Sequence, residues 1–141
     1  MDLLVVGGDV NTGNIAPAEE GDSGADQIQH MATAVRHVFA SGVTIGPGAS
    51  LVVTGGPSSL PNSQAASTGA ISLANAGDDV VLRDPAGVTV QSISYNGSLA
   101  SRDGVSMTRE MDGEPESLLV LHDELSGLPS SPNRRNDGTD F

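Results

Sequence analysis

The sequence of 141 residues contains no cysteine, no lysine and no tryptophan. The absence of cysteine excludes disulfides and zinc sites with thiolate ligands, and it removes the usual sequence indicator of the redox compartment. The absence of lysine excludes a Walker-type phosphate loop and a lysine Schiff base. These absences exclude several common kinds of catalytic centre.

Aromatic side chains are also scarce, since Phe39, Tyr95 and Phe141 are the three in the chain. Aromatic residues usually bring the largest buried areas, so a thin core of Val, Leu, Ile, Met and Ala is expected. The length suits one domain. No apolar run approaches the roughly 20 residues of a membrane span. The opening MDLLVVGG lacks the basic region and apolar length of a secretion signal.

Positive charge is the third deficit: six arginines oppose 18 acidic residues, for a formal net charge of -12. A surface this acidic repels the phosphates of nucleic acids and of anionic membranes. We therefore expect no nucleic-acid partner, and the lack of a long apolar run predicts no membrane span.

Short apolar runs punctuated by Gly, Asn, Asp and Pro are most evident between Ile45 and Tyr95. They are typical of antiparallel strands joined by tight turns. The clearest turn is Asp84-Pro85-Ala86-Gly87, which has the residues that a type I turn prefers. The predicted strands are Leu3 to Val6, Ser50 to Thr54, Ala70 to Leu73, Asp79 to Arg83, Gly87 to Tyr95, Gly104 to Arg109 and Ser117 to His122; Ser58 to Gly69 is predicted to be a surface loop.

The alternation of the second hairpin strand changes phase along its length. Val88 and Val90 share one face, whereas Ile93 and Tyr95 fall on the other. A β-bulge near Gln91-Ser92 would bring all four to the core side.

Between Ala25 and Phe39 the apolar residues recur every three to four positions, which is the spacing of an amphipathic helix. Asp22 or Ser23 stands where an N-cap is needed. The pattern predicts one helix, from about Asp26 to Arg36. The expected organisation is an acidic, partly helical and partly disordered segment over residues 1–34, a β domain over 35–123 and a polar C-terminal tail over 124–141.

Four motifs follow one another in the chain: GPGASLVVTGG, SLANAGDDVVLRDPAGVTVQSISY, DGVSMTRE and SSPNRRNDGTDF. Together and in this order, over about Arg36 to Phe141, they resemble the bacterial branch of the lamin tail domain. The resemblance implies an immunoglobulin-like β-sandwich in which these positions serve packing and turn geometry. It also implies an extracellular or cell-surface protein of several domains.

The chain departs from that family at its start. Members usually open with a strand that reads like EFVELYN and an LSGW segment with a core tryptophan. In their place stand the acidic stretch and ADQIQHMATAVRH. A sandwich without its first strands would expose a sheet edge and part of an inner face. Either the chain is a truncated, rearranged or misread gene product, or the predicted helix covers the gap.

Catalytic patterns are missing from the sequence. It has no G-x-S-x-G nucleophile elbow, and its three histidines, His30, His37 and His122, lack metal-binding spacing. A triad of a histidine, Asp123 and one of the serines is conceivable, since sequence does not show proximity. The favoured interpretation is that the histidines lie at the surface or at strand ends.

One segment resembles a calcium loop. Asp9, Asn11 and Glu20 occupy positions 1, 3 and 12 of such a loop, whose oxygen ligands suit a hard cation. Gly13 and Asn14 depart from the pattern at positions 5 and 6. A solvated acidic loop is the favoured reading, with these three residues as calcium candidates.

Three short motifs have a structural and a functional interpretation each. Asp78-Asp79 reads as a turn former or as a carboxylate pair, and Asn96-Gly97-Ser98 as a turn or as a glycosylation sequon. Arg134-Arg135 reads as part of an exposed tail that is tethered to the acidic body or as a contact for a partner. The structural interpretation is favoured for all three.

Together with the resemblance, these features predict an all-β, immunoglobulin-like antiparallel sandwich that lacks the family's usual first strands. The expected role is that of a non-catalytic interaction or accessory domain with a protein partner and no cofactor. One alternative is an assembly element that self-associates through a sheet edge, and another is a calcium-stabilised extracellular domain. Size-exclusion chromatography tests the first, and the effect of calcium on the melting temperature tests the second.

Overall fold

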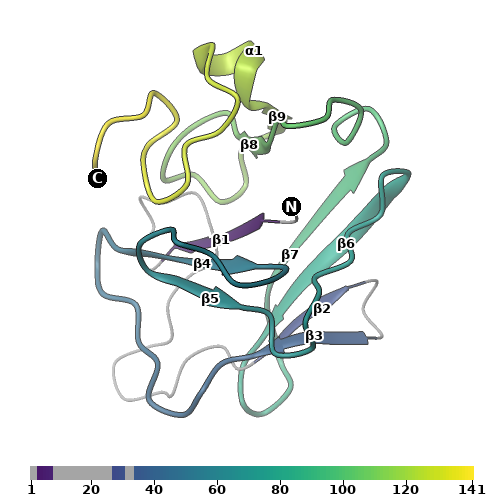
Figure 1. Cartoon of the computed structure of the whole chain (residues 1–141), viewed down its shortest axis with the longest axis vertical. Helices are drawn as coiled ribbons and strands as arrows, with labels where there is room; N and C mark the ends of the chain where they lie inside the picture. Colours follow the sequence, from purple (N-terminus) through teal and green to yellow (C-terminus); the bar gives the residue numbers. More distant parts are fainter. Residues whose placement is uncertain (1–2, 8–26, 31–33) are drawn as a thin grey trace.

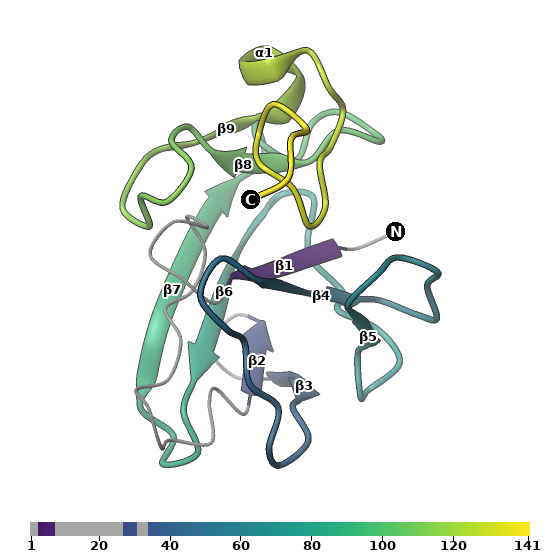
Figure 2. The ribbon, with the colours of Figure 1, turned by 90° about the vertical axis from the view of Figure 1, so that its left-hand side faces the viewer.

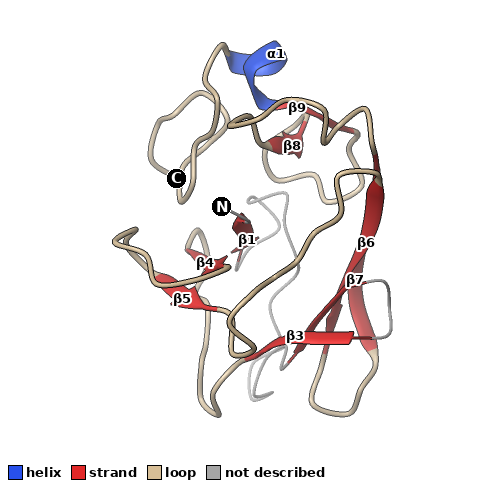
Figure 3. Cartoon of the chain, turned by 45° about the vertical axis from the view of Figure 1, so that its right-hand side comes forward, coloured by secondary structure: helices blue, strands red, loops and turns tan. Residues whose placement is uncertain are grey.

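The computed structural model describes residues 3–7, 27–30 and 34–141 (Figure 1). The described residues are mostly strands and loops, with one short helix (Figure 3). In chain order the elements are β1 (Leu3–Gly7), β2 (Gln27–His30), β3 (Ala34–Val38), β4 (Ser50–Thr54), β5 (Ser63–Ala65), β6 (Gly77–Arg83), β7 (Thr89–Asn96), β8 (Met107–Arg109), β9 (Leu119–Leu121) and α1 (His122–Ser126). The prediction of an all-β chain is confirmed.

The strands form three small sheets, in the orders β1-β4-β5, β3-β2-β6-β7 and β8-β9. All pairs are antiparallel except β4 and β5, which run parallel. The sheet of β1, β4 and β5 lies across from the β6–β7 hairpin (Figure 2). The parallel pair departs from the expected purely antiparallel arrangement.

The core lies between these two larger sheets and is almost entirely aliphatic. Its central members come from β4, β6 and the segments that follow β3 and β5: Phe39, Val53, Ala66, Ile71, Val80 and Leu82. Phe39 is the one aromatic ring in this cluster. A thin aliphatic core is what the scarcity of aromatic residues predicts.

The β6–β7 hairpin is confirmed, with its turn at Asp84 to Gly87. The N–H of Gly87 donates to the carbonyl oxygen of Asp84 at 2.9 Å, and Oδ1 of Asp84 accepts from the N–H of Val88 at 2.8 Å. The register shifts where Leu82 pairs with Gln91 and Arg83 with Thr89, so the bulge falls at Val90.

The bulge lies slightly earlier than predicted, and its expected consequence is wrong. Ile93 and Tyr95 turn inward, whereas Val88 and Val90 are 61% and 37% exposed. Both valines lie on the tip side of the pair of Leu82 and Gln91, and Leu82 is the core member nearest to the tip. The phase change therefore marks the end of the core.

The predicted helix from Asp26 to Arg36 is wrong. Gln27–His30 and Ala34–Val38 are antiparallel strands, and β2 also pairs with β6. In β3 the buried His37 and the buried Phe39 just after it flank the exposed Val38, which is the two-residue period of a strand. The helical spacing combined apolar residues from two separate strands, and pairing with β6 outweighed it.

Two further predictions fail between Ser58 and Leu73. The polar interval Ser58 to Gly69 contains β5, which pairs with β4. Ala70 to Leu73 forms no strand, although Ile71 is buried in the core. Backbone pairing with β4 made a strand of a polar segment that has no apolar alternation. Ser50–Thr54 agrees with β4 residue for residue.

His37 joins the two larger sheets. Its Nδ1 accepts a hydrogen bond from the N–H of Ser67 at 3.1 Å, and its Nε2 lies 3.2 Å from Oε1 of Gln64 in β5. This pattern assigns a neutral ring with the proton on Nε2. Burial lowers the pKa of His37 from its ordinary value, and the bond to Gln64 offsets part of that effect.

We expect the contribution of His37 to the free energy of unfolding to be fully present above about pH 6.5. Below that pH the contribution should fall, because the unfolded chain binds more protons than the folded chain there. Protonation of Nδ1 also leaves the Ser67 N–H without its acceptor, a cost of about 1–3 kcal/mol. Urea unfolding from about pH 8 to about pH 5 tests this. His37→Asn keeps an acceptor and does not titrate, so its profile should be flatter; identical profiles would contradict the role of His37.

A third layer contains β8, β9, α1 and the C-terminal tail (Figure 1). Two asparagines attach the tail. Oδ1 of Asn133 accepts from the hydroxyl of Ser50 at 2.7 Å, and the amide of Asn136 bonds to both Thr108 and the carbonyl of Arg109, each at 2.7 Å. These bonds tie the tail to β4 and to β8.

Candidate functional site

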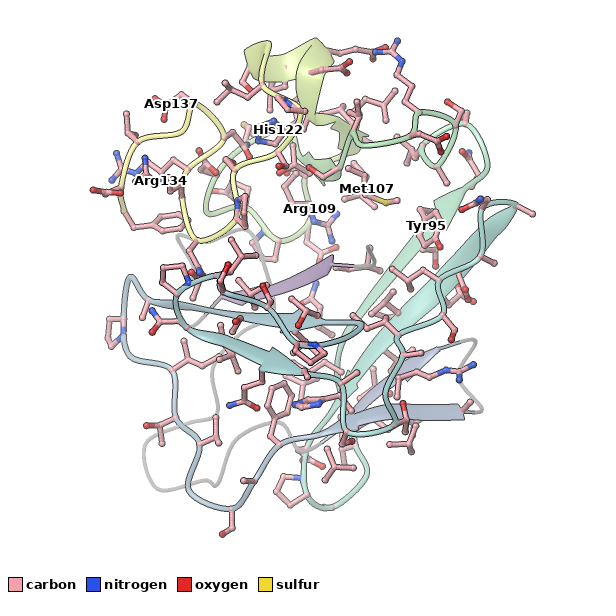
Figure 4. All side chains as sticks on the ribbon, in the orientation of Figure 1. Tyr95, Met107, Arg109, His122, Arg134 and Asp137 are labelled. Atoms are coloured by element: carbon pink, nitrogen blue, oxygen red, sulfur yellow. The ribbon has the colours of Figure 1, made fainter. Side chains whose placement is uncertain are left out.

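A cavity of about 420 Å³ lies between the β6–β7 hairpin, the β8–β9 pair and the C-terminal tail. This volume is within the range of small-molecule sites. Met107 and Arg109 extend from β8 on the side that faces the sheets below (Figure 4). The apolar part of the lining comes from all three walls: Leu73, Val80, Ile93, Met107, Leu119 and Phe141.

Three of the six arginines line this cavity: Arg102, Arg109 and Arg134. Their gathering is notable in a chain with a net charge of -12. The carboxylates of Asp103 and Asp112 also reach the lining. The cavity thus combines apolar walls with more positive charge than the chain as a whole.

Arg109 is the least satisfied of the three. Its Nη1 donates to the carbonyl oxygen of Ser117 at 2.6 Å. Its Nε is buried and has no hydrogen-bond partner. Burial lowers the pKa of Arg109, and the nearby charge of Glu116 opposes that lowering. A partly desolvated guanidinium therefore borders the cavity with donors to spare.

The other two arginines already have acceptors. Arg102 bonds to the carboxylates of Asp123 and Glu124, both at 2.7 Å, and these contacts raise its pKa. Arg134 donates to the carbonyl oxygen of Gly138 at 3.1 Å and lies 3.6 Å from Asp140. Both side chains are substantially exposed, so these ion pairs add little stability.

His122 is 1% exposed and connects α1 to the tail. Its Nδ1 donates to the carbonyl oxygen of Leu128 at 2.7 Å, so in the neutral ring Nε2 accepts from the hydroxyl of Ser131, also at 2.7 Å. His122 and Ser131 both reach the cavity lining. The ring holds the tail against the end of β9.

The considered triad does not form with Asp123. The carboxylate of Asp123 pairs with Arg102, and a backbone carbonyl takes the place next to His122 Nδ1. His37 and His122 are buried and do not lie at the surface, but both lie at strand ends, near the end of β3 and directly after β9, as the interpretation also allowed. A histidine inside a strand or at a strand end carries no sequence signal that separates a buried ring from a surface one.

The calcium candidates Asp9, Asn11 and Glu20 lie outside the described residues. Within residues 3–7, 27–30 and 34–141, no group of three or more acidic or histidine side chains is arranged to hold a metal ion. Within the same ranges, no helix is long and apolar enough to cross a membrane.

The two turn interpretations are confirmed. Asp78 is buried, and its carboxylate accepts from the N–H groups of Ala74 and Asp79 at 3.0 and 2.9 Å. Asn96 closes a turn in which its Oδ1 accepts from the N–H and the hydroxyl of Ser98. Arg135 bonds within the tail through its backbone, whose N–H donates to Thr139.

Sequence reasoning did not identify Arg109 as a site residue. The residue lies in the DGVSMTRE motif, where a strand was predicted and β8 forms at Met107–Arg109. The position of an arginine at the end of a short predicted strand, in a strongly acidic chain, could have indicated a functional residue. Its exposure to a cavity depends on the tail, which is distant in sequence.

Comparisons with protein-family models, with curated proteins and with solved structures found no match for this chain.

Proposed function

We propose that this chain is a non-catalytic binding domain of the lamin tail type, with an immunoglobulin-like sandwich, and that the cavity receives part of its partner. The resemblance of four ordered motifs supports the family and an extracellular or cell-surface location. The observation that carries the binding role is the cavity itself, in which half of the arginines in the chain meet an apolar wall.

The chemistry of the lining favours binding over turnover. Apolar side chains supply contact area, and a small number of polar groups fix orientation, as in most ligand sites. Arg109 is the polar group with unused hydrogen-bonding capacity. His122 is held on both ring nitrogens, which suits a structural tie between α1 and the tail.

We expect anilinonaphthalene sulfonate, a dye with an apolar body and one negative charge, to bind the folded protein saturably and one to one. Met107→Arg places a bulky charged side chain in the cavity and should weaken binding about tenfold or more. Met111→Arg is the matched control, because Met111 is 55% exposed and lies outside the lining. Fluorescence titration measures both variants.

Circular dichroism should show the same strand content for both variants, so that lost binding is not lost folding. Equal dye affinity in Met107→Arg and the unsubstituted protein would overturn the cavity as the binding site.

A further inference from the structure

Arg109 offers a free donor suited to a carboxylate. Arginine has five N–H donors in a rigid fork. Its Nη1 donates to the carbonyl oxygen of Ser117, and its Nε is buried without a partner. Nη2 has no acceptor among the described residues and is not shielded from solvent, so it is the donor that a ligand in the cavity can reach. A hydrogen bond from a guanidinium to a carboxylate is charge-assisted and stronger than one between neutral groups.

Because Arg109 is partly buried, a hydrogen-bond acceptor for its guanidinium would be stabilising. Nε is shielded from solvent, so its hydrogen bond to water is lost without replacement. A buried donor without a partner costs free energy, and a charged one costs more. A bound anion at the accessible Nη2 would offset part of the cost of burying this charge.

The surroundings favour a ligand with a single negative charge. Asp103 and Asp112 line the same cavity, and the chain carries a net charge of -12. Phosphate-rich ligands would meet this repulsion at every added charge. The carboxylate of Asp112 accepts from the N–H of Asn136, so it is held beside the cavity.

The rest of the ligand must be apolar. The side chains of Val80, Ile93, Met107 and Leu119 line the cavity from two facing walls. Burial of an apolar body against them adds favourable free energy in proportion to the area removed from water.

We infer that the cavity binds ligands that carry one carboxylate on an apolar body, with Nη2 of Arg109 holding the carboxylate. The inference rests on the proposed binding function and specifies its ligand class. A fatty acid and an apolar peptide with a free C-terminus share this chemistry.

Calorimetric titrations with decanoate, decanol and decyltrimethylammonium, each below its micelle concentration, test the charge preference. Decanoate should bind about tenfold or more tightly than the other two. A second pair of probes is an apolar tripeptide with a free C-terminus and its C-terminal amide. Stronger binding of the free tripeptide than of decanoate would identify a peptide source, and the reverse a lipid source.

The variants locate the carboxylate. Arg109→Gln and Arg109→Lys should each weaken binding of the better carboxylate about ten- to hundredfold and leave decanol unchanged, because lysine keeps the charge but places no donor at the position of Nη2. Arg135→Gln is the matched control, since Arg135 is exposed and lies outside the lining of this cavity, and it should change affinity less than about threefold.

Equal binding of decanoate and decanol, or unchanged carboxylate affinity in both Arg109 variants, would overturn this inference while dye binding in the cavity remained. Loss of the dye result would instead overturn the proposed function. The two failures are therefore distinguishable.

Discussion

Phe39→Ala is expected to destabilise the protein by about 3–5 kcal/mol, the usual cost of truncating a buried phenylalanine. Phe39 is 6% exposed and belongs to the core between the two larger sheets. Its ring also meets His37 edge to face, with centroids 4.5 Å apart. Few other side chains in this chain have comparable volume to fill the space.

The expected loss is a large fraction of the roughly 5–15 kcal/mol that holds a typical domain folded. Thermal unfolding should therefore occur about 10–20 °C lower in Phe39→Ala. Urea denaturation gives the free energy directly.

The other phenylalanine supplies the control. Phe141 is only partly buried and lies at the cavity rather than in the core. Phe141→Ala should cost about 1 kcal/mol or less. Equal losses in the two variants would show that the inter-sheet core is not the main source of stability.

The parts of the fold that sequence predicted are those specified by local chemistry. The turn at Asp84 to Gly87 and the carboxylate turn at Asp78 follow from the preferences of individual residues. The strand Ser50–Thr54 follows from a β-branched run between glycine turns. Such signals act within a few residues, so a single sequence contains them completely.

The parts that sequence missed depend on contacts between distant residues. β2 became a strand through pairing with β6, and β3 through pairing with β2, against a helical spacing. The same holds for the site, because Arg109 borders a cavity whose far wall is the tail held by Asn133 and Asn136. Neither asparagine differs locally from a residue in an ordinary polar loop.

The position of the cavity can also be related to the uneven distribution of charge in the chain. A strongly acidic protein keeps non-specific anions away. Arginines collected at one apolar cavity create a local exception, and this is where we propose that a single carboxylate binds. On this view the acidity and the binding site act together, since the first raises the selectivity of the second.

Among the glycine substitutions, Gly77→Ala is expected to destabilise the fold the most. Gly77 begins β6 with a φ of +122°, which an L-residue rarely adopts. A Cβ there would lie 2.8 Å from the carbonyl oxygen of Tyr95 and 3.0 Å from Cα of Asn96. Both are backbone atoms of the paired strand β7, so neither moves without disturbing the hairpin.

The expected cost is about 1–3 kcal/mol for the backbone conformation, with a further 1–3 kcal/mol for the forced contact. Dye binding should weaken as well, since Tyr95 lines the cavity. Its hydroxyl donates to the carbonyl of Ala74, so a shift of β7 disturbs that bond too. Urea unfolding and dye titration measure the two effects.

Two other glycines separate these contributions. Gly87 has a φ of +84° with open space around it, so Gly87→Ala should incur only the conformational cost of about 1–2 kcal/mol. At Gly46 a Cβ would also meet open space, and the φ is not in the left-handed region, so Gly46→Ala should be neutral or stabilising by up to about 1 kcal/mol. If Gly77→Ala proved no more destabilising than Gly87→Ala, the close approach of β6 to β7 at Tyr95 would not be a constraint on this fold.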